Sequence, residues 1–185
     1  MTSSVRGIDH IGITVPDIEK ATLFFERAFG AQVLYHSVDA ETDNIDQPAQ
    51  QHTLKLFPGT KIHAIRMLVM PHGPGIELFE MHGPEQGMPA RASDFGLQHF
   101  AVYVDDFDSA IAAFTAAGGE MFTAPKPLSF PDEQGEGNAF CYGQTPWGSI
   151  VELISWPTPM PYEKTTNLRR WKPWVLFLCY VRCYF

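Results

Sequence analysis

The sequence has few of the features that mark secreted, nucleic-acid-binding or membrane proteins. Its three cysteines form no paired framework, which fits a reducing cytosol. The net charge is −8, whereas a nucleic-acid surface needs clustered Lys and Arg. No apolar run approaches the roughly 20 residues that span a bilayer. We therefore expect a cytoplasmic protein that binds neither nucleic acid nor membrane.

What the sequence does contain is an internal repeat. Residues 8–33 read IDHIGITVPDIEKATLFFERAFGAQV, and residues 97–122 read LQHFAVYVDDFDSAIAAFTAAGGEMF. Aligned without gaps, the two segments place His10 on His99. The other matching pairs are Val15/Val104, Asp17/Asp106, Ala21/Ala110, Phe25/Phe114, Ala28/Ala117 and Gly30/Gly119. Such a repeat indicates a fold built from two copies of one unit, and the shared histidine suggests that both copies contribute to one site.

Each copy has the pattern of a strand followed by a helix. Residues 7–15 alternate with period two, so His10 and Thr14 share one face and apolar side chains share the other. Asp17 is a suitable N-cap for a helix that ends at Gly30, and Asp105 or Asp106 is its counterpart in the second copy. With further strands expected at 31–35, 61–70, 75–80, 139–143 and 148–155, each half reads β-α-β-β-β.

An apolar, strand-like run with one central acid follows each copy. The run GIELFE contains Glu77 and the run GSIVELIS contains Glu152. An unpaired carboxylate is costly to bury, so each acid must face water or a partner. Two histidines and two glutamates suit a divalent ion such as Zn, Ni, Mn, Co or Fe(II). The alternative is an ordinary solvent-facing sheet surface, and Glu80 competes with Glu77 but has the opposite strand parity.

Two segments lie outside the repeat. Residues 36–59 include a polar, acidic stretch that predicts a long surface loop or a short helix. Residues 161–185 form a C-terminal tail whose apolar end mildly favours an oligomer. We expect one domain over residues 1–160, with modules at about 7–82 and 97–155.

Four motifs together resemble the vicinal oxygen chelate superfamily, which includes glyoxalase I, methylmalonyl-CoA epimerase, extradiol dioxygenases and the bleomycin and fosfomycin resistance proteins. The motifs are DHIGITVPDIEKATLFFERAFG, GIELFE, LQHFAVYVDDFDSAIAAFTAAGG and PWGSIVELIS. The resemblance implies an α+β fold in which two paired βαβββ modules form a cupped mixed sheet around one divalent metal ion. Residue by residue, it implies His10, Glu77, His99 and Glu152 as the metal ligands.

The resemblance also implies a chemistry. The ion would act as a Lewis acid that stabilises the enolate formed when a proton leaves the carbon beside a carbonyl. Glu152 or Glu77 would be the catalytic base. Strand parity adds Thr14, Phe79 and Tyr103 as substrate-binding candidates. The expected function is therefore a metal-dependent, glyoxalase-like lyase or isomerase, of lactoylglutathione lyase or epimerase type. It would act on a small metabolite or xenobiotic, and the resemblance favours a homodimer.

Two alternatives within the resemblance stay open. An extradiol ring-cleaving dioxygenase would use Fe(II) with open positions for substrate and oxygen, but such enzymes do not usually have an acid at the position of Glu77. An antibiotic-sequestering protein of the bleomycin-resistance type would bind its drug without metal, and such proteins generally lack the four ligands. The four-ligand set therefore favours proton transfer over both.

Overall fold

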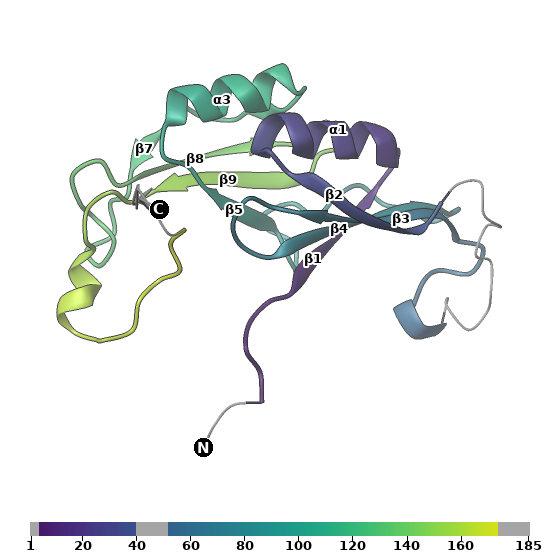
Figure 1. Cartoon of the computed structure of the whole chain (residues 1–185), viewed down its shortest axis with the longest axis horizontal. Helices are drawn as coiled ribbons and strands as arrows, with labels where there is room; N and C mark the ends of the chain where they lie inside the picture. The colour runs from purple at the N-terminus through teal and green to yellow at the C-terminus, as the bar shows by residue number, and fades with distance from the viewer. Residues whose placement is uncertain (1–3, 40–51, 174–185) are drawn as a thin grey trace, which may run out of the picture.

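Both copies of the repeat fold as a strand, a helix and further strands (Figure 1). The structure is a computed structural model that describes residues 4–39 and 52–173. The first module contains β1 (His10–Val15), α1 (Ile18–Phe29), β2 (Gln32–Val38), β3 (Lys61–Val69) and β4 (Gly75–His82). The second contains β5 (His99–Tyr103), α3 (Phe107–Ala116), β6 (Glu120–Met121), β7 (Lys126–Pro127), β8 (Ala139–Gln144) and β9 (Ile150–Ser155). A short 3₁₀ helix, η1 (Pro161–Lys164), follows.

Each module closes on itself by pairing its first strand with its last. One sheet has the order β1-β4-β3-β2, and the other has the order β5-β9-β8-β6, with β7 also paired to β8. The pairs β1/β4 and β5/β9 are parallel, while the other pairs are antiparallel. This mixed α+β architecture confirms the predicted fold class, and β7 is a short strand that the sequence pattern did not reveal.

Helix α1 begins and ends where the sequence predicts, and α3 begins at one of the two predicted N-caps but ends at Ala116. The Asp17 side chain accepts a hydrogen bond from the Lys20 backbone N–H at 2.9 Å, and Gly30 ends α1 in the left-handed region at φ 67°. The Asp106 side chain, rather than that of Asp105, caps α3 by accepting from the Asp108 N–H at 3.0 Å. The repeat therefore predicts the aspartate that caps the start of each helix.

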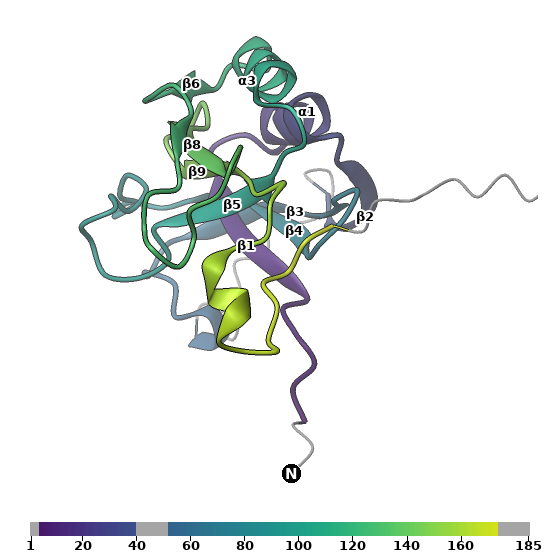
Figure 2. The same cartoon turned by 90° about the vertical axis from the view of Figure 1, so that its left-hand side faces the viewer.

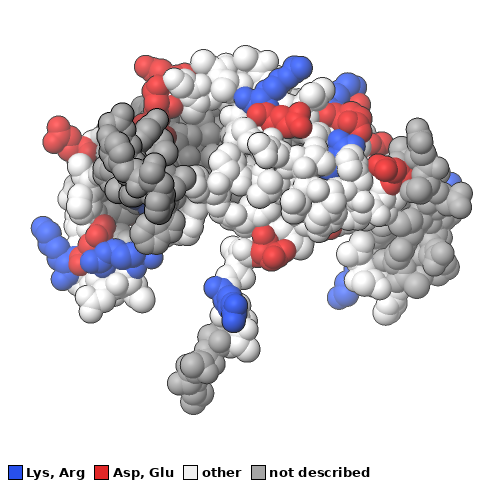
Figure 3. All heavy atoms as spheres, in the orientation of Figure 1, with Lys and Arg blue, Asp and Glu red and all other residues white. Residues whose placement is uncertain are grey.

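The helices lie side by side over the same face of the two sheets (Figures 1 and 2). Aromatic side chains fill the space between them: the Phe24 and Phe114 rings are 5.4 Å apart in an edge-to-face arrangement, and Trp147 lies 5.4 Å from Phe24. Phe24, Phe25 and Phe114 are almost fully buried. This shared aromatic core joins the modules into one body, which is hollowed on the side away from the helices (Figure 3).

Several strand boundaries differ from the sequence-based expectation. β2 extends to Val38, beyond the predicted end of the strand at residue 35. Register shifts in its pairing with β3 break the period-two pattern, so the sequence did not show this extension. β9 begins at Ile150 rather than Gly148, because residues 145–149 form a hydrogen-bonded turn in which Gly148 has a φ of 95°. Residues 40–51 and the apolar end of the tail, 174–185, lie outside the described residues, so the expectations for them stay predictions. No helix in the described ranges has the length and apolarity needed to cross a membrane.

Candidate functional site

The pairing of first and last strands brings a histidine and a glutamate together in each module. In the first module, Gly12 is the register partner of Glu77, and the His10 Nε2 atom lies 3.1 Å from Glu77 Oε2. In the second, Ala101 is the partner of Glu152, and His99 Nε2 lies 3.3 Å from Glu152 Oε2. In both modules, the glutamate pairs with the residue two positions after the histidine. The internal repeat thus extends to the geometry of the two pairs.

Both pairs lie on the sheet faces that the helices do not cover. Along β1, Ile13 and Val15 are buried in the core while His10 and Thr14 are exposed, as the predicted alternation requires. In β9, Val151 and Leu153 pack into the same core, which leaves Glu152 on the other face. Glu80, on the helix side of β4, instead accepts a hydrogen bond from the Ile18 backbone N–H at 2.9 Å. This contact gives Glu80 a structural role at the start of α1.

The four predicted ligands lie as two pairs rather than as one group of four. Within residues 4–39 and 52–173, no three His, Cys, Asp or Glu side chains lie close enough together to hold a metal ion. A single chain therefore offers two half-sites, each with one imidazole and one carboxylate.

The geometry within each pair fits two ligands of a shared ion. Ligand atoms at about 2.0–2.2 Å from one ion are separated by about 2.8–3.6 Å at tetrahedral or octahedral angles. The observed gaps of 3.1 Å and 3.3 Å lie in this range. Asp9 adds a further feature of metal sites, because its Oδ2 lies 2.8 Å from His10 Nδ1 and would orient the ring. His99 Nδ1 is buried and has no hydrogen-bond partner among the described residues.

The two pairs differ in their electrostatic surroundings. A hydrogen bond from the His10 ring to the Asp9 carboxylate, helped by Glu77, raises the pKa of His10 above its ordinary value. Glu152 is only 9% exposed, and this burial raises the pKa of its carboxyl, although His99 and Arg170 act in the opposite direction. The second pair is therefore the more desolvated of the two.

The raised pKa of Glu152 predicts a pH-dependent stability difference. With a pKa in the folded state above the ordinary 4.5, the carboxyl stabilises the fold below that value and loses this contribution as pH rises through the folded pKa. Glutamine cannot titrate, so in metal-free protein the stability of Glu152→Gln relative to wild type should increase between about pH 4 and pH 8. Urea unfolding across this range measures the difference, and a constant difference would contradict the prediction.

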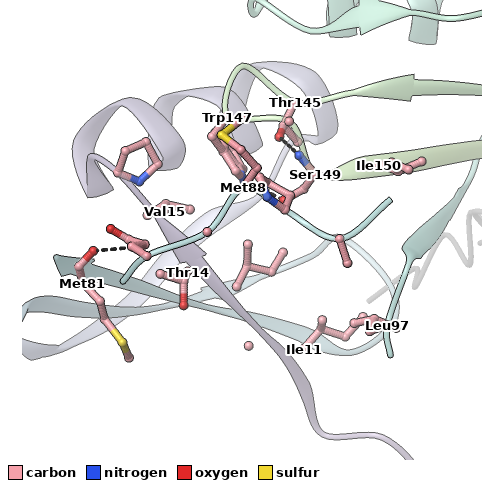
Figure 4. A pocket seen from close by; sticks show the side chains of 18 of the residues that line it. Ile11, Thr14, Val15, Met81, Met88, Leu97, Thr145, Trp147, Ser149 and Ile150 are labelled. Carbon is pink, nitrogen blue, oxygen red and sulfur yellow. Dashed lines mark hydrogen bonds between the residues drawn. The ribbon is translucent and has the colours of Figure 1, made fainter. Parts of the chain in front are cut away.

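A cavity of about 1050 Å³, part of whose lining is drawn in Figure 4, reaches His99 of the second pair. Its walls come from β1, from the loop after β4 (83–90) and from the turn between β8 and β9 (145–149), and His99 is part of its lining. Several lining residues have neutral hydrogen-bonding side chains, namely Thr14, Gln86, Gln98, Gln144 and Ser149. The cavity can therefore hold a small polar molecule next to His99.

The predicted substrate-binding residues occupy different places. Thr14 lines this cavity, as Ile150 does. Phe79 lies outside the lining, and its ring approaches to 3.5 Å of the position a Cβ would take at Gly12. Tyr103 packs edge-to-face on Trp156 with ring centroids 4.7 Å apart. Substrate contact by Phe79 and Tyr103 stays a prediction.

The start of the C-terminal tail folds back on the second module. The Arg170 backbone N–H donates to the Tyr162 hydroxyl at 2.8 Å, and the Arg170 guanidinium lies 4.6 Å from the Trp156 ring centroid. Lys172 donates to the Trp156 carbonyl at 2.9 Å. These contacts bring Arg170 near enough to affect Glu152, which no sequence pattern indicated because the fold-back depends on tertiary contacts.

A second unpredicted neighbour of the site is Tyr142 on β8. It is the register partner of Glu152, and burial together with the nearby charge of Glu152 raises the pKa of its phenol. Strand pairing creates this contact, so the only signal available from the sequence was an aromatic residue on a strand of unknown register.

Comparison with known proteins agrees with this architecture. The family model described as Glyoxalase/Bleomycin resistance protein/Dioxygenase superfamily matches residues 9–142. A 2-epi-5-epi-valiolone epimerase from an Actinomyces species is 33% identical over 168 residues, which cover 90% of this chain and 88% of the relative.

Solved structures support the same fold. A glyoxalase family protein from Bacillus cereus superposes with a TM-score of 0.61 at 19% identity, covering 83% of this chain and 95% of that one. A mutant of a fosfomycin resistance protein from Listeria monocytogenes, complexed with Mn(II) and 1S,2S-dihydroxypropylphosphonic acid, has a TM-score of 0.53 at 16% identity, covering 88% and 99%. The predicted resemblance is confirmed, and the chain belongs to the glyoxalase, bleomycin resistance protein and dioxygenase superfamily.

Proposed function

We propose that the protein is a metal-dependent isomerase that epimerises a carbon beside a carbonyl group of a small molecule. The observation that carries this proposal is the presence of two His–Glu pairs in matching register, with gaps of 3.1 Å and 3.3 Å. The epimerase relative, which is similar over 90% of the chain, favours this reaction over ring cleavage and over drug sequestration.

The proposed chemistry assigns a role to each carboxylate. A bound divalent ion would polarise the carbonyl and stabilise the enolate charge. Glu152 would take the proton from the carbon beside the carbonyl, and Glu77 would deliver a proton to the opposite face, which inverts the centre. His10 and His99 would hold the ion together with these carboxylates. Burial of Glu152 suits its role, because a raised pKa makes its carboxylate a stronger base.

The lining of the cavity supports a substrate with several hydroxyl groups. Its neutral hydroxyl and amide side chains can donate to and accept from such groups, and they lie among many apolar residues together with the charged Lys55 and Glu85. We therefore take 2-epi-5-epi-valiolone, the molecule named for the epimerase relative, as the first substrate to test.

Because one chain offers two half-sites, we propose that the complete centre forms between two chains of a homodimer. Twofold symmetry would place the His10–Glu77 pair of one chain against the His99–Glu152 pair of the other, giving two equal centres. Each centre would then have the two imidazoles and two carboxylates predicted from the sequence. Both pairs lie on sheet faces that the helices leave uncovered, and the His10–Glu77 pair is the more exposed of the two.

A complementation experiment tests this centre. Wild-type protein should contain about one divalent ion per chain by elemental mass spectrometry, whereas His10→Ala/Glu77→Ala and His99→Ala/Glu152→Ala should each contain almost none. Heterodimers of the two variants, isolated with two different tags, should regain about one ion per dimer, because one of the two centres is then intact.

Each result has a clear meaning for the proposal. An unchanged metal content in both variants would overturn the ligand assignment, and heterodimers without metal would overturn the shared centre.

Inversion of the test substrate is measured as uptake of solvent deuterium at the inverted carbon. Oxygen consumption with a catechol and Fe(II), without such deuterium uptake, would favour the dioxygenase alternative instead.

A further inference from the structure

The two His–Glu pairs have the same register but different neighbours on the third strand. In the second module, β8 places Tyr142 opposite Glu152. In the first module, the equivalent position on β3 is Met67, the register partner of Glu77. A phenol therefore accompanies one glutamate, and a thioether, which is only a weak acceptor, accompanies the other. The internal symmetry of the fold makes this difference visible.

Tyr142 contacts both members of the second pair. As the register partner of Glu152, it is the direct cross-strand neighbour of that carboxylate on the same sheet face. Its ring packs edge-to-face against His99 with centroids 5.3 Å apart, and Phe140 supports it from the other side at 5.7 Å. The neighbouring side chains thus restrict the ring next to Glu152.

This contact restricts a side chain that would otherwise rotate. A glutamate has three rotatable bonds, and its proton can be transferred only in a narrow range of orientations. One oxygen of Glu152, Oε2, faces His99 at 3.3 Å, and the phenol of the neighbouring Tyr142 can donate to the same carboxylate. In the buried surroundings of Glu152, a hydrogen bond to a charged group is strong enough to hold one rotamer.

We propose that Tyr142 is a positioning residue that holds the Glu152 carboxylate in the orientation needed for proton transfer. The inference rests on the proposed epimerase function and deepens it, since it makes the second pair the one equipped to remove the substrate proton. The role belongs to the hydroxyl group, whereas the ring serves to pack His99.

Replacement of Tyr142 by phenylalanine separates these two contributions. We expect kcat to fall by about 10- to 100-fold, as is typical when a group that orients an active-site residue is lost, with KM and metal content nearly unchanged. Tyr35→Phe removes a hydroxyl from the edge strand β2 and should leave kcat unchanged. An unchanged kcat in Tyr142→Phe, or a fall that Tyr35→Phe reproduces, would overturn the proposal.

A second measurement does not depend on turnover. In the metal-free full-length protein, the effect of Tyr142→Phe on the urea unfolding midpoint is compared between the wild-type and Glu152→Ala backgrounds. The hydrogen bond predicts a clear loss in the first background and almost none in the second. Equal losses in both would overturn the contact itself. Coupled losses without any epimerisation would leave the contact intact and refute the proposed function.

Discussion

Turnover by Glu152→Gln should fall by about 100- to 10,000-fold, the contribution that a well-placed general base makes. The amide retains the size of the side chain and an oxygen that can face His99, but it cannot accept a proton from carbon. Most of the bound metal should remain, because three ligands and the amide oxygen are still available. Deuterium uptake at the substrate carbon and metal content, measured on the same preparation, check the two halves of this expectation.

The matched control for this substitution is Glu80→Gln. Glu80 lies on β4 as Glu77 does, but on the helix side, where it accepts a hydrogen bond from the Ile18 backbone N–H. Glutamine can accept the same bond, so activity and metal content should both persist. Full activity in Glu152→Gln would exclude this residue as the base and would transfer that role to Glu77.

Removal of the Phe114 side chain should greatly lower the free energy of unfolding. Phe114 is fully buried, its ring lies 5.4 Å from that of Phe24, and it therefore bridges α3 and α1. A Phe→Ala change at such a site costs about 3–5 kcal/mol, because the lost burial is accompanied by a cavity. Since domains of this size have only about 5–15 kcal/mol in total, Phe114→Ala should lose a large share of the free energy of unfolding.

Urea unfolding of Phe114→Ala and Phe130→Ala measures this effect. Phe130 is 71% exposed, so its truncation should change the free energy of unfolding by less than about 0.5 kcal/mol. A similar small loss for Phe114→Ala would mean that the modules do not depend on their shared aromatic core.

The repeat in the sequence predicted more of this molecule than its length or composition did. Asp17 and Gly30 bound α1 because a side-chain cap and a left-handed C-cap are local requirements that a few residues reveal. Strand parity is also a local pattern, and it favoured Glu77 over Glu80 as the candidate site residue. The structure places Glu80 on the helix side of β4. Both pairs of site residues follow from combining local patterns with the repeat.

Other features depend on contacts that no local pattern encodes. Tyr142 approaches Glu152 only through the register of β8 with β9, and Arg170 does so only because the tail folds back over Trp156. The separation of the four predicted ligands into two pairs follows from the relative placement of whole modules. Bulges in the β2/β3 pairing displaced the predicted strand ends for a similar reason, since they break the alternation on which the prediction rests.

The parallel pairing of first and last strands has a consequence for folding. His10 and Glu77, like His99 and Glu152, are far apart in the chain and become neighbours only when a whole module has closed. Closing so long a loop costs chain entropy, which a shared ligand would help to offset. A metal ion bound by such a pair would link the first strand of each module to its last strand. Its release should then loosen the outer strands β1 and β5 before the aromatic core between the helices gives way.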